Sequence, residues 1–417
     1  MFNIAAKIKF IRENKITKYS FIVFVGSFIA GIGGYLYNVL MGRMLGPAEY
    51  GIFASLVSLL YIISVPAGTL SRVVSRSIAE LHAHEKFEEA RYFIDKINWL
   101  FLKIGLALFV LFLLISPALA GFLRLESALP VIILGTVFFG SFIGAITGAA
   151  LNGLQRFYHL SANAILGSVL KIIFGALFVR LGWGASGAVG ALTASGIFAI
   201  IHAYFSFGLP EKSREIKIDW KRMIAYARPV FWATLAITAL YNIDVVMVKH
   251  YLDPETAGYY GILSLLGKIV LFITGAIPTV LFPIVAGRQS RNEEHFHLLK
   301  YSFLLVLAVS LAITAFYFLA PDFIVSLLFG ASYLPIAPFL GYFGIVMTLF
   351  SLINVLATYN LSLNSMKFVP ILLAGVALEI GLIYFFHQNI LQVTQCMMAA
   401  MFLTFAGLAV FQYRQPR

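Results

Sequence analysis

The stretch GRMLGPAEYG, residues 42–51, is followed much later by a similar stretch, HYLDPETAG, residues 250–258. Three residues of the first copy align with three of the second at a spacing of 207 positions, close to half of the 417-residue chain: Leu45, Pro47 and Gly51 with Leu252, Pro254 and Gly258. Proline after glycine or aspartate ends one helix and begins the next. The same polar turn therefore recurs at the same place in each half, which predicts a duplicated fold.

The composition places these turns between membrane-spanning segments. The chain is 61% hydrophobic and only 12% charged, whereas soluble domains carry about 25% charged residues. A helix of about 20 apolar residues crosses a bilayer, and apolar runs of this kind follow one another from Ser20 onward. We predict twelve spans, at 19–44, 50–78, 97–123, 128–154, 157–182, 185–209, 226–251, 257–286, 296–329, 333–362, 368–387 and 390–412.

The first apolar run is too long for a signal peptide and lacks a small-residue cleavage site, so we expect it to be retained as a span. The only cysteine, Cys396, falls in the last span. It provides neither a disulfide framework nor a cysteine-based metal site.

Lysine and arginine concentrate on alternate connections, which predicts the orientation of the chain because cytoplasmic loops carry an excess of these residues. The basic residues before span one, after span two and after span six are Lys7, Lys9, Arg12, Lys15 and Lys18; Arg72, Arg76, Lys86, Arg91 and Lys96; and Lys212, Arg214, Lys217, Lys221, Arg222 and Arg228. We therefore expect a multi-pass protein of the cytoplasmic (inner) cell membrane with both termini in the cytoplasm. This asymmetry, together with attraction to anionic membrane lipids, accounts for most of the net charge of +12, and no nucleic-acid motif accompanies it.

The only long polar connection in mid-chain, PEKSREIKIDWKRM, lies between spans six and seven. We predict an N-terminal six-helix lobe at 1–209, a cytoplasmic linker at 210–225 and a C-terminal six-helix lobe at 226–417. Because six is even, the two lobes form a parallel repeat. A second pair of similar turns, NGLQRF at 152–157 and LNSMKF at 363–368, supports the duplication. The predicted fold class is an all-α polytopic membrane protein with twelve transmembrane helices in two six-helix lobes.

Four stretches together carry a family resemblance. These are GRMLGPAEYG after the first span, NGLQRF between spans four and five, GWGASGAVGA at the start of span six, and YLDPETAGYYG after span seven. The sequence resembles the polysaccharide (oligosaccharide or O-antigen type) flippases of the multidrug/oligosaccharidyl-lipid/polysaccharide exporter superfamily, over nearly the whole chain in the number and order of spans.

The resemblance implies a transporter with two six-helix lobes around a central cavity, which opens alternately to the cytoplasm and the exterior. Its expected substrate is a glycan linked to a polyprenyl phosphate or diphosphate, moved to the outer leaflet for surface-polysaccharide biosynthesis, with membrane lipids and glycan-assembly enzymes as partners. The multidrug branch of the superfamily, which exports small cations, is the alternative. The basic residues in the spans favour an anionic substrate.

Charged residues within spans are costly and point to functional sites. Lys171 and Lys268 each lie ten or more residues from both ends of their spans, too deep to reach the membrane surface easily, so we predict that they bind the phosphate head of the substrate. Arg72, near the end of span two, and Arg43 and Arg156, in the repeated turns, are further candidates for substrate binding. The alternatives are structural ion pairs for the two lysines and anchoring at the membrane surface for the arginines, as for Lys103.

Two acids lie in mid-span, Asp244 in span seven and Glu379 in span eleven. With oxygen groups from Asn242 and Thr394, they predict a site that couples transport to a proton or sodium gradient, and we expect no other cofactor. A buried salt bridge to Lys268 or Lys171 is the alternative. Neither acid is duplicated, since Asp244 corresponds to Tyr37 and Glu379 to Ser168, which favours different roles for the two lobes.

Other functional classes fit the sequence less well. The stretch HAHEKFEEAR, residues 82–91, has no tight zinc spacing and reads as a solvated helix, so we predict no metal site. A membrane glycosyltransferase would need acids and a base beside a cleft on a large loop, but the outer connections are short, so we predict no catalytic residues. A major-facilitator transporter would carry its characteristic basic turn after span two, where this chain reads SRVVSRSIAELHAHEKF.

Overall fold

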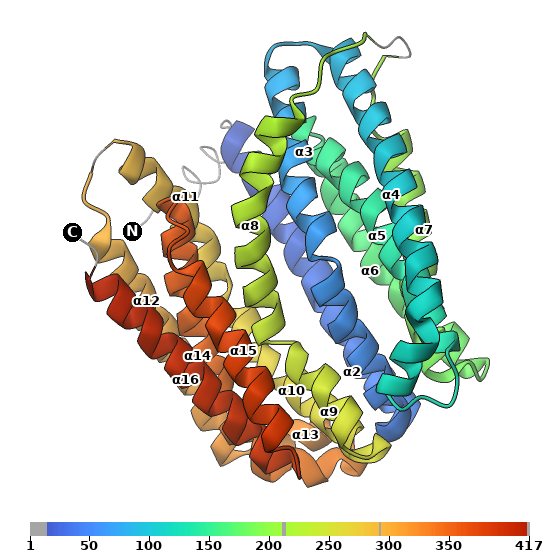
Figure 1. The fold of residues 1–417 in the computed structure, drawn as a ribbon, viewed down its shortest axis with the longest axis vertical. Helices are drawn as coiled ribbons and strands as arrows, with labels where there is room; N and C mark the ends of the chain where they lie inside the picture. The colour runs from blue at the N-terminus through green and yellow to red at the C-terminus, as the bar shows by residue number, and fades with distance from the viewer. Residues whose placement is uncertain (1–14, 211–213, 292, 415–417) are drawn as a thin grey trace, which may run out of the picture. The chain divides into compact units, whose positions relative to one another are not determined.

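The computed structural model describes residues 15–210, 214–291 and 293–414, and every regular element in these ranges is a helix (Figure 1). The first half holds α2 (Lys15–Ile63), α3 (Val65–Ala83), α4 (Phe87–Phe122), α5 (Leu129–Gly153), α6 (Phe157–Arg180) and α7 (Gly184–Phe205). The second half holds α8 (Trp220–Leu240), α9 (Ile243–Tyr251), α10 (Pro254–Thr274), α11 (Ala276–Ser290), α12 (Phe296–Leu319), α13 (Pro321–Phe329), the 3₁₀ helix η1 (Ala331–Ile336), α14 (Ala337–Ser362), α15 (Val369–Phe385) and α16 (Ile390–Arg414).

These helices agree with the predicted spans. Ten helical stretches of the described residues are long and apolar enough to cross a membrane, and Val369–Phe385 is a shorter apolar helix. One of the ten, Phe21–Ile63, has 43 residues, about twice what one crossing needs. It contains a break at Gly46, so it holds the first span and the beginning of the second. The all-α, multi-pass fold with twelve spans is therefore confirmed.

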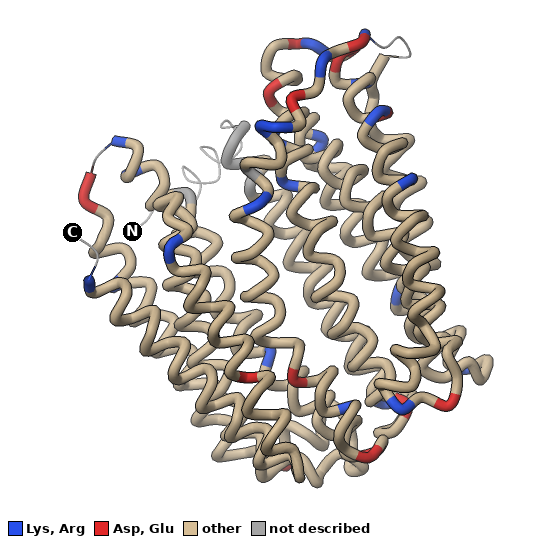
Figure 2. Tube along the Cα trace, in the orientation of Figure 1, with Lys and Arg blue, Asp and Glu red and all other residues tan. Residues whose placement is uncertain are grey.

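The surface of these helices matches a hydrocarbon environment. Large apolar side chains point outward along the spans, as in Leu114 and Leu319, which are 75% and 82% exposed. Charged residues gather at the helix ends, and few lie along the helices between them (Figure 2). Lys7, Lys9, Arg12 and Lys212, which contribute to the predicted orientation, lie outside the described residues.

The helices are interrupted both between spans and within a span. Gly46 has φ 71° and ψ 173°, a conformation that a side chain would strain, and it divides α2 in front of Pro47. Span seven is divided at Tyr241 and Asn242, between α8 and α9. In the second half, Asp253 begins α10 by accepting hydrogen bonds from the amides of Glu255 (3.1 Å) and Thr256 (3.0 Å), an N-cap that satisfies two otherwise unpaired donors.

Two compact units make up the chain. Unit 1 comprises Met1–Met44, Ile63–Gly121 and Glu126–Arg228, and unit 2 comprises Leu45–Ile62, Phe122–Leu125 and Pro229–Arg417. The main division, at 228, follows the linker predicted at 210–225, but the segment Leu45–Ile62 from the first half packs in unit 2. Whether the stretches 1–209 and 226–417 act as separate lobes stays a prediction.

Each unit has its own packed interior. In unit 1, α5 packs against α3 and α7, and α6 packs against α7. In unit 2, α14 lies at the centre, against α10, α12 and α16, and most of its length is buried.

The two copies of the repeated turn contact each other within unit 2. A Cβ atom added to Gly51 would lie 2.8 Å from the backbone nitrogen of Gly258, and one added to Gly258 would lie 1.7 Å from the carbonyl oxygen of Pro47. Only glycine leaves room for this approach of backbone to backbone. The short stretch that recurs in the sequence is thus also the place where its two copies meet.

Candidate functional site

The break in span seven places polar groups inside unit 2. α8 ends at Leu240, and α9 begins at Ile243, so Asn242 stands at the N-terminus of the second piece with its side chain fully buried. Its amide nitrogen donates to the carbonyl of Thr238 (2.9 Å), and its amide oxygen accepts from Lys268 Nζ (3.1 Å). Irregular backbone at membrane depth is tolerated where protein surrounds it, and the side chain of Asn242 is held by both neighbours.

Asp244 follows in the first turn of α9, where the helix dipole favours a negative charge. Its Oδ2 accepts a hydrogen bond of 2.9 Å from the hydroxyl of Tyr260, which also lies 2.8 Å from Met397 Sδ. Its other oxygen, Oδ1, is buried and has no partner among the described residues. Half of this carboxyl group is therefore unsatisfied in a fully buried position.

Glu379 on α15 is also fully buried, and neither of its carboxyl oxygens has a partner in the described part of the chain. It lies close enough to Asp244 for the two groups to interact electrostatically. The helices explain this, because α9 packs against α10, α15 and α16. We call Asn242, Asp244, Tyr260 and Glu379 the polar cluster.

Thr394 lies on α16, next to the helices of the polar cluster, and is fully buried. Its hydroxyl donates to the carbonyl of Ile390 (2.8 Å), so its hydrogen is already used within the helix. The structure thus brings three of the four predicted ion-coupling residues into one cluster and places the fourth on a neighbouring helix.

Two buried carboxyl groups that interact electrostatically cannot both stay charged without compensation. A proton on one or both of them, or a cation between them, would supply it. Carboxylate and amide oxygens are hard ligands, and interrupted transmembrane helices are places where transporters bind Na⁺ or H⁺. Asp244, Glu379 and Asn242 carry oxygens of these types.

Lys268 connects this cluster to the aromatic residues of unit 2. It projects from α10, its Nζ lies 5.5 Å from the ring centre of Tyr241, and it interacts electrostatically with Asp244. It nevertheless forms no ion pair within 4 Å among the described residues. Lys268 therefore has a hydrogen-bond partner and an aromatic ring beside it, but no direct salt bridge.

Lys171 has a similar environment in unit 1. It projects from α6, and its Nζ lies 5.2 Å from the ring centre of Tyr37, whose hydroxyl donates to the carbonyl of Ala188. The half-buried lysine lines a cavity of about 300 Å³ together with Ser168 and Ser195. In the described ranges it too forms no ion pair.

The three predicted arginines lie at more exposed places. Arg43 and Arg72 are exposed on α2 and α3. Arg156, at the start of α6, donates to the carbonyl of Gly208 (3.3 Å) and lines a cavity of about 320 Å³ with Tyr19 and His82. Arg156 and Lys171 line separate cavities, so the structure does not gather the predicted basic residues at one point.

Sequence reasoning did not single out Tyr260, which hydrogen-bonds Asp244, or Met397, whose sulfur lies beside the Tyr260 hydroxyl. The repeat contains a signal for Tyr260, because its counterpart 207 residues earlier is Phe53. A buried phenylalanine in one copy and a buried tyrosine in the other differ by one hydroxyl, and that hydroxyl is the one that contacts Asp244. Comparing the two copies residue by residue would have found it.

The fold is similar to those of solved membrane transporters and of a flippase. An inward-facing multidrug-resistance transporter of the MATE family, described as a member of the MOP superfamily, has a TM-score of 0.72 at 16% identity, with 91% of this chain and 96% of that chain covered. The lipid II flippase MurJ, in an inward closed conformation, has a TM-score of 0.75 at 16% identity, with 95% and 88% covered. The eukaryotic MATE transporter AtDTX14 has a TM-score of 0.69 at 10% identity, with 96% of each chain covered.

The sequence profile of a family described as "Polysaccharide biosynthesis protein" matches residues 40–338, which is more than half of the chain. The protein therefore belongs to this polysaccharide biosynthesis family, and the resemblance found in the sequence is confirmed. No relative among curated proteins matches the chain. The solved structures that share the fold are those of transporters and a flippase, which agrees with the prediction of a transporter rather than an enzyme.

Proposed function

We propose that this protein is a flippase that moves polyprenyl-phosphate- or polyprenyl-diphosphate-linked oligosaccharides from the cytoplasmic to the outer leaflet of the cell membrane by alternating access. The observation that carries the proposal is the pair of lysines, Lys171 and Lys268, one in each unit. Both lie deep in apolar spans, and neither has a carboxylate within ion-pairing distance among the described residues. A positive charge at such depth is costly unless an anion compensates it.

The phosphate head of a lipid-linked glycan is such an anion. The tyrosine ring beside each lysine stabilises the ammonium group while no substrate is bound, through a cation–π interaction. Membership in a polysaccharide biosynthesis family supports a glycan as the cargo. The basic connections predicted to face the cytoplasm support loading from that side.

We further propose that the polar cluster couples this movement to a proton or sodium gradient. Asp244 and Glu379 are fully buried, are close to each other, and lack partners for three of their four oxygens. Binding and release of a positive ion there would change the charge of the interior of unit 2. Lys268 interacts with Asp244 and hydrogen-bonds Asn242, so the ion site and the proposed head-group site share a neighbour.

The first test compares surface-glycan display in cells that carry Lys171→Ala or Lys268→Ala with display in the wild type. We expect both variants to reach the membrane but to lose display and to accumulate lipid-linked glycan. Arginine at either position should restore part of the activity because the charge is retained. Lys300→Ala, an exposed lysine at the start of α12, is the matched control and should behave as wild type. Normal display in both variants would remove the two lysines from the substrate path.

A second experiment tests the coupling site separately. Asp244→Asn and Glu379→Gln keep the shape of each side chain but remove its negative charge. We expect transport by either variant to lose its dependence on the ion gradient. Transport that retains the full dependence of the wild type in both variants would exclude these acids as the coupling site.

The multidrug branch remains the competing function, because two buried carboxyl groups can also attract an organic cation. Native mass spectrometry of lipids that co-purify with the protein separates the two. A sugar-bearing polyprenyl phosphate that is lost in Lys268→Ala supports the flippase. Ordinary phospholipids alone, together with efflux of ethidium by the protein, would support drug export.

A further inference from the structure

Unit 1 contains a cavity of about 370 Å³ that the substrate path and the polar cluster do not use. It lies where the second half of α3 meets the start of α4 and the segment Ile216–Met223, which leads into α8. We call it the linker pocket. By the distribution of basic residues, this end of the unit is the predicted cytoplasmic end.

The wall of the linker pocket is fixed by hydrogen bonds. The amide of Arg214 donates to the carbonyl of Glu88 (3.1 Å), and the hydroxyl of Tyr92 donates to Glu215 (2.8 Å), so the segment before the pocket is attached to α4. Asp219 accepts from the amide of Arg222 (2.9 Å) and begins α8. The segment therefore forms a defined side of the cavity.

The lining carries excess positive charge. Four basic side chains, Arg76, Lys86, Lys217 and Arg222, face two carboxylates, Glu80 and Asp219. Lys86 pairs with Glu89 outside the lining (3.4 Å). Lys217 is exposed and forms no ion pair among the described residues.

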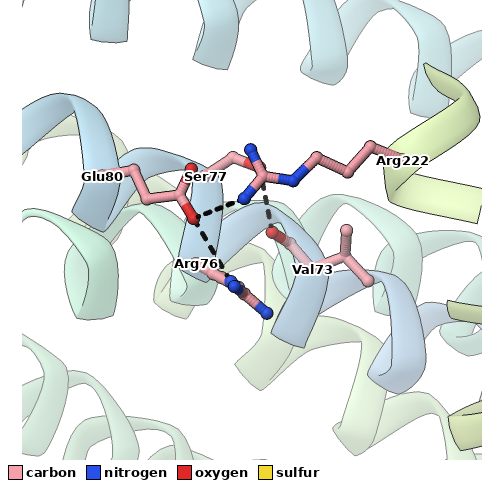
Figure 3. A network of polar contacts seen from close by, with 5 residues as sticks. All are labelled: Val73, Arg76, Ser77, Glu80 and Arg222. Carbon is pink, nitrogen blue, oxygen red and sulfur yellow. Dashed lines mark hydrogen bonds and ion pairs between the residues drawn. The ribbon is translucent and has the colours of Figure 1, made fainter. Parts of the chain in front are cut away.

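Glu80 is the centre of this arrangement (Figure 3). Its Oε1 accepts from Arg76 Nε at 3.3 Å and from Arg222 Nη2 at 3.5 Å, so two guanidinium groups from different helices converge on one carboxylate oxygen. Both contacts are longer than the usual charge-assisted hydrogen bond of about 2.7–2.9 Å. The Arg222 guanidinium has five N–H donors, which is more than its contact with Glu80 uses.

We propose that the linker pocket binds an organic phosphate or diphosphate. Planar guanidinium groups bind phosphate oxygens in pairs, and Arg76 and Arg222 already point toward a shared anionic oxygen, with Lys217 beside them. The remaining lining is largely apolar, from Val73, Leu81, Phe93, Ile216, Ile218 and Met223. Such a surface suits the carbon part of the ligand. The bound phosphate would connect α3 to the segment that leads into α8.

The phosphate can belong to a lipid of the inner leaflet or to a soluble molecule, and two probes separate these sources. Sodium pyrophosphate tests the soluble form, and dioleoylphosphatidic acid in mixed micelles tests the lipid form. Binding to the purified full-length protein is measured by isothermal titration, with dioleoylphosphatidylcholine as the lipid control.

Variants make the test specific to the pocket. The double variant Lys217→Gln/Arg222→Gln removes two cations, and we expect it to weaken binding at least tenfold, since one hydrogen bond to a charged group accounts for about that factor. Glu80→Gln should tighten binding several-fold, because it removes the carboxylate that competes for both arginines. Arg291→Gln, an exposed arginine paired with Glu293 in unit 2, is the matched control and should bind as wild type.

Each probe and each variant gives a result that either supports or overturns the proposal. Binding of pyrophosphate shows that the phosphate group suffices, and binding of phosphatidic acid alone shows that the apolar part is needed. Binding of neither probe overturns the proposal, as does a double variant that binds as tightly as wild type or a Glu80→Gln variant that binds more weakly. The proposed flippase function does not depend on this outcome, because Lys171 and Lys268 do not line the pocket.

Discussion

Replacing Gly258 with alanine should destabilise the protein strongly, because the new methyl group has no space. Its carbon would lie 1.7 Å from the carbonyl oxygen of Pro47, whereas carbon and oxygen in contact stay about 3.3 Å or more apart. The obstacle is a backbone atom and cannot rotate away, so the two copies of the repeated turn must separate by about 1.6 Å. Overpacking of this kind costs 1–3 kcal/mol and occasionally more. We expect about 3 kcal/mol.

The assay is thermal unfolding in detergent, followed by the fluorescence of the four tryptophans. Gly140→Ala on α5 is the matched control, since a Cβ atom there meets no heavy atom within 4 Å. Alanine is favoured over glycine inside a helix by about 0.5–1 kcal/mol, so the control should unfold at the same or a higher temperature. Equal unfolding temperatures for Gly258→Ala and wild type would show that the contact between the two turns is wrong.

Three further predictions concern substitutions at Tyr260, Asp253 and His295. Tyr260→Phe removes the 2.9 Å hydrogen bond to Asp244. The sodium or proton concentration that gives half-maximal stabilisation of the protein should therefore shift tenfold or more. An unchanged concentration would show that Tyr260 is not part of the proposed ion site. Asp253→Ala should cost about 1 kcal/mol in unfolding free energy through the lost N-cap. Although burial raises the pKa of Asp253, hydrogen bonds from Thr256 and Glu255 outweigh it and hold the pKa below its ordinary value of 3.8. The wild type should therefore lose this contribution as pH falls below 3.8, and Asp253→Asn, which keeps the cap, should not show that dependence. His295 hydrogen-bonds Tyr359 and Gln289. Its pKa is lowered mainly by burial and also by the nearby His297 and Arg288. Because the folded state then disfavours the protonated form, stability should fall as pH drops below the ordinary value of 6.5, and less so in His295→Gln; identical pH profiles would contradict this.

The fold could be predicted because its determinants are local. Apolar length sets each span, and the Pro47 and Pro254 turns mark corresponding hairpins, so span number and duplication follow from the sequence alone. The packing of Leu45–Ile62 into unit 2 could not be predicted in this way. It depends on glycine contacts between residues 207 positions apart, which no local pattern encodes.

The charged residues of the candidate site could be predicted from the sequence, whereas the contacts that they make could not. A buried charge stands out in an apolar span whatever surrounds it, so Asp244, Glu379, Lys171 and Lys268 could be found directly. Their partners are ordinary residue types, such as Tyr241 beside Lys268 and Tyr260 beside Asp244, which are common in any membrane helix. The break at Asn242 also gives no strong signal, because the interruption is stabilised by tertiary contacts rather than by a glycine or proline in the sequence.

The contact between the two turns also bears on how the chain has evolved. After a duplication, each half is free to change wherever its residues meet only their own half. Gly51 and Gly258 do not have this freedom, because a larger residue at either position collides with the backbone of the other copy. Selection against a larger residue in one turn therefore also preserves the packing of the other turn. This shared constraint explains why a few residues of the turn still match at a distance of 207 while Asp244 and Tyr37, in the same register, have diverged.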